Sequence, residues 1–297
     1  MMPENITSQL VSSLCPKRPA DGHKGTFGTA LIIAGSRYMS GAQTLAVMSA
    51  LRSGTGMVRV FAPDDSLMST RINCPCALLS AWGDTAASSI RQFDNYLKKA
   101  TAVGIGPGLD EDDPRSYALL QHAIINAPRL VIDAGALNIL ARERHVLYEL
   151  LSERADKEGF EPAVLTPHVG EFRRLISRDE SYGDSDMTDS CMHFALRNKC
   201  VTVVKTHKTI VSDIKGKCYI NTVGCDGLAK GGSGDVLTGL IAGFLAQGMK
   251  ADEAAIAGIY LHGLSGDLAS DDIGRRVMIP EDIPGYYDEA FAKTGWI

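Results

Sequence analysis

Stretches that predict buried strands alternate with stretches that predict helices along most of this chain. Short apolar runs rich in β-branched residues predict strands at residues 28–34, 57–62, 101–105, 129–133, 163–166 and 201–205. Apolar residues at helical spacing predict helices at residues 41–53, 114–126, 186–198, 235–247 and 252–270. This alternation is typical of α/β proteins, so we predict a mostly parallel central sheet with helices on both faces.

Two segments depart from this alternation. Residues 209–213 and 217–221, which Lys215 and Gly216 separate, predict a hairpin of more exposed strands. Residues 179–189 are polar and acidic, which predicts a loop rather than a domain boundary. The sequence shows neither a linker of low complexity nor an internal repeat, so we predict one domain over residues 1–297.

Glycines and polar residues fall mainly just after the predicted strands. In an open α/β sheet, ligands bind beyond the carboxyl ends of the strands, so residues at these positions are candidates for a shared site. They are Gly35 and Ser36, Gly106 to Gly108, Asp133, His168, Lys205 and the glycine cluster that begins at Gly231.

The glycine cluster is the strongest single indication of chemistry. Gly231, Gly232 and Gly234 directly precede Asp235 and a predicted helix, so unpaired backbone N–H groups and the positive end of the helix dipole should bind an anion there. Glycine also lets a phosphate approach the backbone closely. A carboxylate would repel a resting phosphate, but Asp235 could take a proton from a hydroxyl group while the N–H groups hold the developing charge. Taken alone, the same residues could form a helix cap after a tight turn.

Composition and charge restrict the class of protein. The 297 residues carry a net charge of −5 and a pI of about 5.8, which argues against a surface for nucleic acid or for an anionic membrane. The apolar runs are too short to cross a bilayer, and the first residues lack a secretory signal pattern. The seven cysteines are scattered without metal-ligand spacing, so we expect reduced thiols in a cytoplasmic protein.

Several common catalytic and nucleotide-binding motifs are missing from the sequence. It has no G-x-x-x-x-G-K-[ST] segment, which excludes a P-loop. The glycines at positions 104, 106 and 108 do not follow the G-x-G-x-x-G spacing of dinucleotide-binding folds. Neither H-E-x-x-H nor G-x-S-x-G is present.

Five segments carry glycines and polar residues in a fixed order along the chain. They are His23-Lys24-Gly25-x-x-Gly28 with Ala34-Gly35-Ser36 and Ser40-Gly41-Ala42; Ile105-Gly106-Pro107-Gly108; Asp133-Ala134-x-Ala136-Leu137-Asn138; Leu165-Thr166-Pro167-His168-x-Gly170-Glu171-Phe172; and Gly231-Gly232-Ser233-Gly234-Asp235-Val236-Leu237-x-Gly239. Together they resemble the nucleotide-dependent NAD(P)H-hydrate dehydratases, which have a ribokinase-like fold. The resemblance covers roughly residues 20–290, so residues 1–20 are expected to be an N-terminal extension. Many relatives carry a fused epimerase domain that would have to lie N-terminal, and we expect a stand-alone dehydratase.

The resemblance implies a reaction of the hydro-lyase class. Members of the family act on NADH or NADPH that carries an added water, (6S)-NADHX or NADPHX, and phosphorylate the ring hydroxyl group from a nucleotide. The ring nitrogen then expels phosphate, which restores the coenzyme. The resemblance implies ADP as the phosphoryl donor and AMP as a product, with ATP as the alternative donor and Mg²⁺ as cofactor.

The same resemblance implies roles for the glycine cluster and for the segment that ends the strand at 201–205. Asp235 would be the general base on the ring hydroxyl group, and the N–H groups of Gly232, Ser233 and Gly234 would hold the transferring phosphate. The residues expected to flank the nucleotide are Lys205, Thr206, His207, Lys208 and Thr209. Either lysine could instead be an ordinary solvated side chain.

Four further residues would complete the site. The small residues Ala42 and Gly108 are expected to line the substrate pocket with Asp235, although small residues commonly serve close packing. His168 follows Pro167 at a strand end, and we favour a substrate contact over a structural role. Glu171 is expected to orient Mg²⁺ through water, but a carboxylate is equally suited to the first turn of a helix.

The sequence departs from the family's pattern at three positions. Gly135 stands where a second aspartate is usual, Val169 where proline is usual, and Thr206 where glycine is usual after the lysine. A carboxylate lost at Gly135 would weaken a contact to substrate or metal. The Gly-Ser-Gly-Asp core and His168 are intact, so we expect activity.

Two other functions stay open at this point. The chain could be a kinase of a small vitamin-precursor alcohol, since such relatives share Gly-x-Gly-Asp, but the His-Lys-Gly and Thr-Pro-His-x-Gly-Glu-Phe segments are not expected in them. It could also be a nucleotide-binding sensor without catalysis, which Gly135 alone favours. The small-residue helix near 254–269 suits either a homo-oligomer interface or ordinary packing, and a preference between NADHX and NADPHX is not readable.

Overall fold

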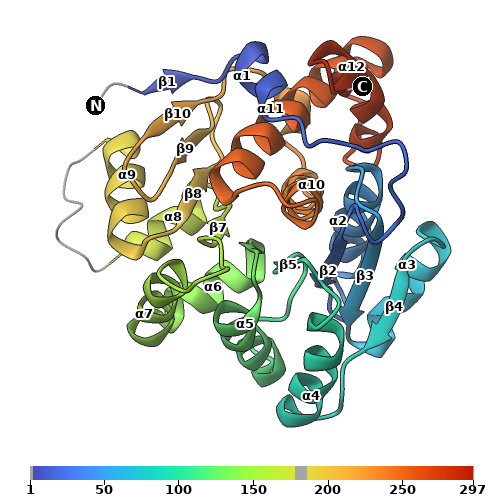
Figure 1. The fold of residues 1–297 in the computed structure, drawn as a ribbon, viewed down its shortest axis with the longest axis vertical. Coiled ribbons are helices and arrows are strands. Elements are labelled where there is room, and N and C mark those ends of the chain that lie inside the picture. The colour runs from blue at the N-terminus through green and yellow to red at the C-terminus, as the bar shows by residue number, and fades with distance from the viewer. Residues whose placement is uncertain (1–2, 178–185, 297) are drawn as a thin grey trace.

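Strands and helices alternate along the chain in the computed structural model, which describes residues 3–177 and 186–296 (Figure 1). The strands are β1 (Glu4–Asn5), β2 (Thr29–Ile33), β3 (Met57–Ala62), β4 (Leu78–Ala81), β5 (Ala102–Ile105), β6 (Leu130–Ile132), β7 (Val164–Leu165), β8 (Val201–Val204), β9 (Ile210–Ser212) and β10 (Cys218–Ile220). The helices are α1 (Ser8–Ser13), α2 (Ser40–Arg52), α3 (Leu67–Asn73), α4 (Ala86–Leu97), α5 (Pro114–Asn126), α6 (Ala134–Arg142), α7 (Arg144–Ala155), α8 (Val169–Ile176), α9 (Met187–Asn198), α10 (Ser233–Ala246), α11 (Ala251–Ala269) and α12 (Tyr287–Lys293).

These strands form one sheet in the order β1-β10-β9-β8-β7-β6-β5-β2-β3-β4. Neighbouring strands run parallel except at β9, which is antiparallel to both β8 and β10. The mostly parallel sheet and the hairpin at 209–221 are therefore confirmed. The expectation that the hairpin strands are more exposed is wrong, because β8 and β10 flank β9 while α9 and α11 pack against it, and β9 is buried throughout.

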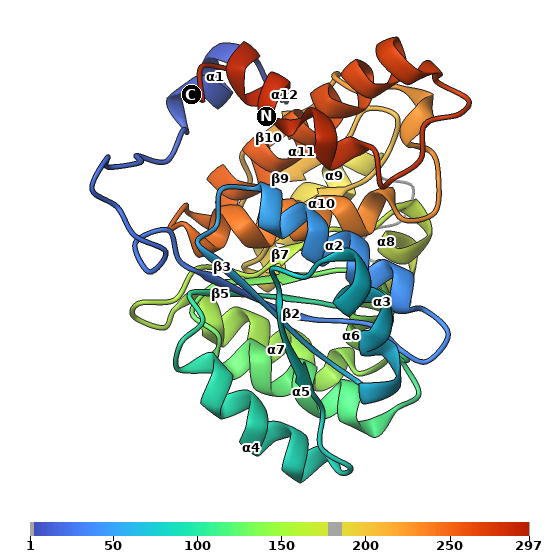
Figure 2. The ribbon, with the colours of Figure 1, turned by 90° about the vertical axis from the view of Figure 1, so that its right-hand side faces the viewer.

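Helices cover both faces of the sheet, as the sequence predicts. Figure 2 shows α10, α2 and α11 on one side of the strands and α4, α5 and α7 on the other. Along β2, Ala30 and Ile32 pack into the core under α2, α10 and α11, whereas Leu31 and Ile33 pack into the core under α4 to α7. All four side chains are fully buried, which explains why β2 reads as an unbroken apolar run.

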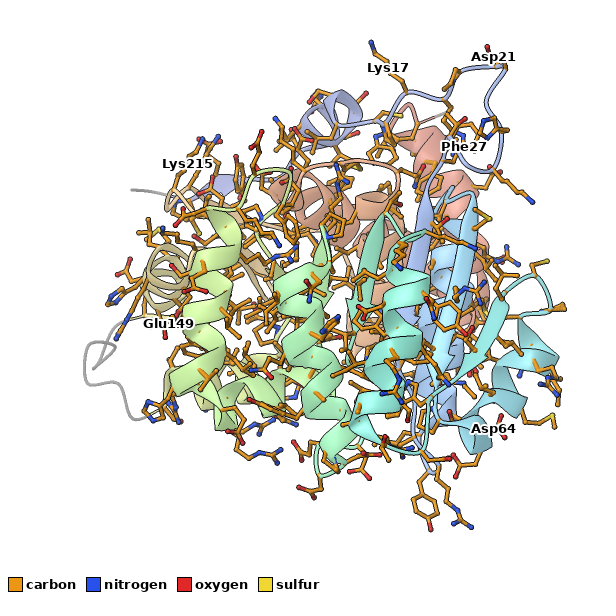
Figure 3. The ribbon with its side chains drawn as sticks, turned by 60° about the horizontal axis from the view of Figure 1, so that its bottom comes forward. Lys17, Asp21, Phe27, Asp64, Glu149 and Lys215 are labelled. Atoms are coloured by element: carbon orange, nitrogen blue, oxygen red, sulfur yellow. The ribbon has the colours of Figure 1, made fainter. Side chains whose placement is uncertain are left out.

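The strand directions place the candidate residues at one end of the molecule. Figure 3 shows Phe27, which precedes β2, at the opposite end from Asp64, which follows β3. The central helix α10 packs closely on α2, since a Cβ atom added at Gly239 would lie 2.0 Å from the carbonyl oxygen of Ala46. This contact fixes the N-terminus of α10 relative to the carboxyl ends of the strands.

The N-terminal residues add to the far edge of the sheet. Strand β1 runs parallel to β10, Val11 of α1 is fully buried, and the indole Nε1 of Trp296 donates a hydrogen bond to the Val11 carbonyl oxygen at 2.8 Å. The first part of the expected N-terminal extension therefore packs against both the sheet and the C-terminal residues.

The helices test three local expectations, on the acidic loop, on the small-residue helix and on membrane spans. Residues 179–185 of the expected acidic loop lie outside the described residues, and residues 187–189 belong to α9 instead of the loop. The small residues of α11 are almost all buried within the chain, so this helix serves ordinary packing. Within the described residues, helices long and apolar enough to cross a membrane are absent.

Candidate active site

A cavity of about 640 Å³ opens at the carboxyl ends of β6, β7, β8 and β10 and at the amino end of the antiparallel β9. Helices α8, α10 and α11 and the segment between β10 and α10 also contribute to its wall. It brings together most residues that the sequence singled out, namely Asp133, His168, Glu171, Lys205, Thr206, His207, Thr209 and residues 231–235. Ala42, Gly108 and Lys208 are not among the residues that line it.

The glycine cluster forms the N-terminus of α10, as predicted. The helix begins at Ser233, two residues earlier than expected, and Gly232 is the N-cap with a φ of 107°. That conformation favours glycine, and an added Cβ atom would also lie 2.6 Å from Cδ1 of Leu45. Asp235 lies in the first turn and is not the cap, so the alternative of a capping aspartate does not apply.

Lys205 places a positive charge beside this helix N-terminus. Its Nζ is 2.8 Å from Oδ1 of Asp133, and a Cβ atom added at Gly234 would lie 2.9 Å from the same Nζ. Asp133 is almost fully buried, and the hydroxyl group of Thr238 donates a hydrogen bond to its Oδ2 at 2.6 Å. Asp133 and Thr238 thus hold the lysine ammonium group against the first turn of α10.

The carboxylates around Lys205 have perturbed acidities. Burial, followed by the charge of Asp133, raises the pKa of Asp235 to about 7, although Lys205 opposes the shift. Burial and the charge of Asp133 also raise the pKa of Glu171. A carboxylate whose pKa lies near neutrality is suited to general-base catalysis, because it is ionised often enough and still accepts a proton readily.

His168 and Glu171 form a reciprocal cap at the start of α8. The ring Nδ1 of His168 accepts hydrogen bonds from the backbone N–H groups of Gly170, at 2.9 Å, and Glu171, at 3.3 Å. In return Oε2 of Glu171 accepts from the His168 N–H at 2.8 Å. Both residues therefore have the structural role that was the alternative for each. The His168 side chain is still 55% exposed, and its Nε2 lies 3.5 Å from Oε1 of Glu171.

Ala42 and Gly108 lie together at the other side of the α10 N-terminus, where α2 begins and β5 ends. A Cβ atom added at Gly108 would lie 3.0 Å from the Ala42 Cβ and 2.5 Å from the Met39 carbonyl oxygen. Gly135 is packed similarly, because its added Cβ atom would lie 2.5 Å from the Leu109 carbonyl oxygen. The role of Ala42 and Gly108 in lining a substrate pocket stays a prediction.

Sequence reasoning assigned no role to several residues of the cavity wall. Asp133 was noticed as a strand-end residue, but its pairing with Lys205 depends on strands that are distant in sequence. Burial lowers the pKa of His262 to about 4, so this histidine is neutral, and its Nε2 has no hydrogen-bond partner among the described residues. Asn221 lies at the end of a predicted strand, which is the signal that could have identified it.

The family model described as NAD(P)H-hydrate dehydratase matches residues 30–287 of the chain. The chain belongs to this family. It is 31% identical over 277 residues to the ADP-dependent (S)-NAD(P)H-hydrate dehydratase of Bacillus subtilis, with 93% of this chain and 94% of that protein covered. It is 34% identical over 285 residues to a bifunctional NAD(P)H-hydrate repair enzyme of Moorella thermoacetica. The match covers 94% of this chain but only 52% of that enzyme, so the chain spans about half the length of such bifunctional relatives.

The fold agrees with that of a solved member of the family. A crystal structure of the ADP/ATP-dependent NAD(P)H-hydrate dehydratase of Bacillus subtilis, co-crystallized with ATP and Mg²⁺, superposes with a TM-score of 0.80 at 27% identity, with 99% of each chain covered. The ribokinase-like fold expected for this NAD(P)H-hydrate dehydratase family member is therefore confirmed.

Proposed function

We propose that the protein converts (6S)-NADHX and NADPHX back to NADH and NADPH by phosphorylating the ring hydroxyl group from a nucleotide and eliminating phosphate. The observation that carries this proposal is the Asp235 carboxylate, whose pKa is raised to about 7, in the first turn of α10. It stands beside the ammonium group of Lys205 and the N–H groups of a glycine helix N-terminus. Family membership supplies the substrate class.

Each group has a distinct task in the reaction. Asp235 accepts the proton of the ring hydroxyl group. At the same time the hydroxyl oxygen forms a bond to phosphorus, and the bond between that phosphorus and the rest of the nucleotide breaks. Lys205 and the N–H groups of Gly232 to Gly234 hold the negative charge of the migrating phosphoryl group, which is worth several kcal/mol when the donors are preorganised. The ring nitrogen then expels phosphate, and loss of a proton from the neighbouring carbon restores the ring.

We propose Mg²⁺ as the cofactor and the phosphates of the nucleotide as its main ligands. No cluster of three or more histidine, cysteine or carboxylate side chains suited to a metal occurs among the described residues. Mg²⁺ keeps several waters and binds mainly to substrate phosphates, so the nearby carboxylate of Glu171 fits a contact through water. When bound, the ion would neutralise charge on the phosphates.

ADP is the donor we propose, with AMP and phosphate as products. One relative from Bacillus subtilis is named ADP-dependent, and an ADP/ATP-dependent dehydratase of the same organism was co-crystallized with ATP and Mg²⁺. The test is turnover with each nucleotide at equal Mg²⁺, with AMP and ADP separated by chromatography. Turnover with ATP that produces ADP, together with no turnover with ADP, would contradict ADP as the donor. The proposal that the protein is a dehydratase would still stand.

Product analysis distinguishes this function from the alternative, a kinase of a small vitamin-precursor alcohol. We expect hydrated NADH to yield free phosphate and a reduced nicotinamide, whereas a kinase would release a stable phosphate ester. Accumulation of an ester from a hydroxyethylthiazole or hydroxymethylpyrimidine, with no turnover of hydrated NADH, would favour the kinase.

We also place the protein in the cytoplasm, with small-molecule substrates as its partners. All seven cysteines are free thiols, which suits a reducing compartment. The net charge of −5 gives no support to a nucleic acid or an anionic membrane as a partner. A homo-oligomer stays a prediction that size-exclusion chromatography with light scattering would test.

A further inference from the structure

The spacing of the strands gives the distance between the two ends of the cavity. Lys205 follows β8, and Asn221 follows β10, two strands further toward the sheet edge. Neighbouring strands are about 4.8 Å apart, so the two strand ends are separated by roughly 10 Å. A nucleotide whose phosphates lie at Lys205 and the N-terminus of α10 would therefore extend its base toward Asn221.

The walls at the Asn221 end of the cavity suit a flat aromatic ring. Val223 and Leu228 come from the segment between β10 and α10, and Ile259 comes from α11. The side-chain Nδ2 of Asn221 donates hydrogen bonds to the carbonyl oxygens of Val223, at 2.7 Å, and Ile259, at 3.5 Å. Asn221 thus joins the segment after β10 to α11, and a purine would lie in the cavity beside these apolar side chains.

The carboxamide oxygen of Asn221 is left without a partner. The residue lines the cavity and is only 4% exposed, yet its Oδ1 accepts no hydrogen bond from the described residues. The assignment of oxygen and nitrogen is constrained, because both contacts of Nδ2 are carbonyl oxygens that require a donor. A buried acceptor without a partner is destabilising, so a donor from a ligand would be favourable here.

We propose that Asn221 is a specificity-determining residue that reads the base of the nucleotide. Its Oδ1 accepts a hydrogen bond from the 6-amino group of adenine. A 6-oxopurine presents an oxygen atom at the same position, so two acceptors would face each other with no proton between them. The inference rests on the proposed nucleotide-dependent function and adds the residue that selects a 6-aminopurine nucleotide.

Two other buried polar groups of the cavity do not compete for this role. Ser233 is the first residue of α10, and His262 interacts with the Ser233 backbone and with the charge of Lys205. Both therefore interact with the phosphate end of the cavity.

The test compares ADP with IDP, which differ in the amino or oxo group at position 6 of the purine and in the proton that the oxo form carries on N1. The kcat/KM for each is measured with hydrated NADH and Mg²⁺ for the wild type, Asn221→Ala and the control Thr222→Ala, whose exposed side chain is not part of the cavity. We expect the wild type and the control to prefer ADP by at least about tenfold, and Asn221→Ala to reduce that preference to within about twofold.

A second variant separates reading of the base from support of the walls. Asn221→Asp keeps an acceptor oxygen but loses both amide donors, so it should bind both nucleotides more weakly and still prefer ADP. If Asn221→Ala weakened ADP and IDP equally and kept the wild-type preference, Asn221 would only support the walls and the inference would fail.

Calorimetric binding of ADP and IDP, without the hydrated coenzyme, separates the inference from the proposed function. Binding that prefers ADP and depends on Asn221, in a protein that dehydrates nothing, would contradict the function and support the inference. Binding of ADP and IDP with equal affinity by the wild type would overturn the inference even if hydrated NADH is turned over.

Discussion

At the scale of single residues, the site depends on one cation among several carboxylates. Lys205 is 2.8 Å from Asp133, and its charge lowers the pKa of both Asp235 and Glu171, while burial and the carboxylates raise them. Burial is the larger effect at Asp235, which is why its pKa reaches about 7. In the proposed reaction the lysine would therefore have two functions, since it would attract phosphate and keep the general base from being protonated outright.

The first prediction concerns Asp235. We expect Asp235→Asn to lower turnover by at least about a hundredfold, the usual size of a general-base contribution, with nucleotide binding retained. In the wild type, kcat/KM should fall as the pH drops through about 7, because the base must be ionised to accept a proton. Near-normal turnover in the variant, or a rate independent of pH between 6 and 8, would remove Asp235 from this role.

The stability of the same variant provides its control. A carboxyl group whose pKa rises from 3.8 to about 7 on folding binds its proton more tightly in the folded state, so the wild type loses stability as the pH rises across that range. Asp235→Asn lacks this penalty. We expect its free energy of unfolding at pH 8 to exceed that of the wild type by on the order of 1–3 kcal/mol, measured by urea denaturation.

Lys205→Met tests the second function of the lysine. Without the ammonium charge, the neighbouring carboxylates raise the pKa of Asp235 further, so the acidic limb of the kcat/KM profile should move to higher pH as the rate falls. Lys208→Met is the matched control, because Lys208 is exposed and does not line the cavity. An unchanged limb in Lys205→Met would mean that the lysine does not influence the base.

At the scale of secondary-structure elements, the sequence predicted best where a pattern was local. The apolar runs of β2 and β3 and the glycine start of α10 needed no information from distant residues. By contrast, α7 has no clear apolar face and was missed, as was β4, an edge strand whose Leu78 is 42% exposed. Tertiary packing forms these elements, so their sequences carry little local signal.

For the candidate site too, local sequence patterns identified some residues, whereas contacts between distant strands were not predictable. Strand-end positions identified His168 and Lys205, because parallel strands bring their carboxyl ends together. The pairing of Lys205 with Asp133, and the partnerless acceptor of Asn221, depend on side-chain geometry across several strands. Periodicity and motif spacing contain no information of that kind.

Gly135 gives a prediction at the level of helix α6. An added Cβ atom would lie 2.5 Å from the Leu109 backbone oxygen, so Gly135→Ala should lower the free energy of unfolding by about 1–3 kcal/mol, because backbone must shift. Gly285→Ala is a suitable control, since nothing lies within 4 Å of its added Cβ atom. If thermal denaturation showed the two variants to be equally stable, the contact with Leu109 would be looser than described.

At the scale of the whole molecule, the sheet extends from β4 to β1, and the C-terminal residues contact the N-terminal helix α1 beside it. Strand β1 pairs with β10, and the C-terminal Trp296 packs over Val11 of α1 through its hydrogen bond. The cavity lies at the carboxyl ends of the parallel strands β6, β7, β8 and β10, and no described residue of β1 or α1 lines it. The N-terminal elements therefore affect stability more than chemistry.

Deletion of residues 1–13 tests that separation. The deletion removes β1 and α1 and exposes the surface that the fully buried Val11 covers, which should cost at least about 2 kcal/mol of stability. We expect a lower melting temperature in calorimetry, with turnover retained at temperatures well below it. An unchanged melting temperature would show that these residues are a dispensable extension.

The most direct test of the central claim is the recovery of dihydronicotinamide absorbance from hydrated NADH in the presence of ADP and Mg²⁺, with released phosphate measured in the same sample. We predict that the wild type restores the absorbance only when the nucleotide is present, with one phosphate released per NADH formed. Asp235→Asn should restore it at least about a hundredfold more slowly. Recovery without any nucleotide, or a phosphate ester that accumulates while the absorbance stays low, would contradict the account.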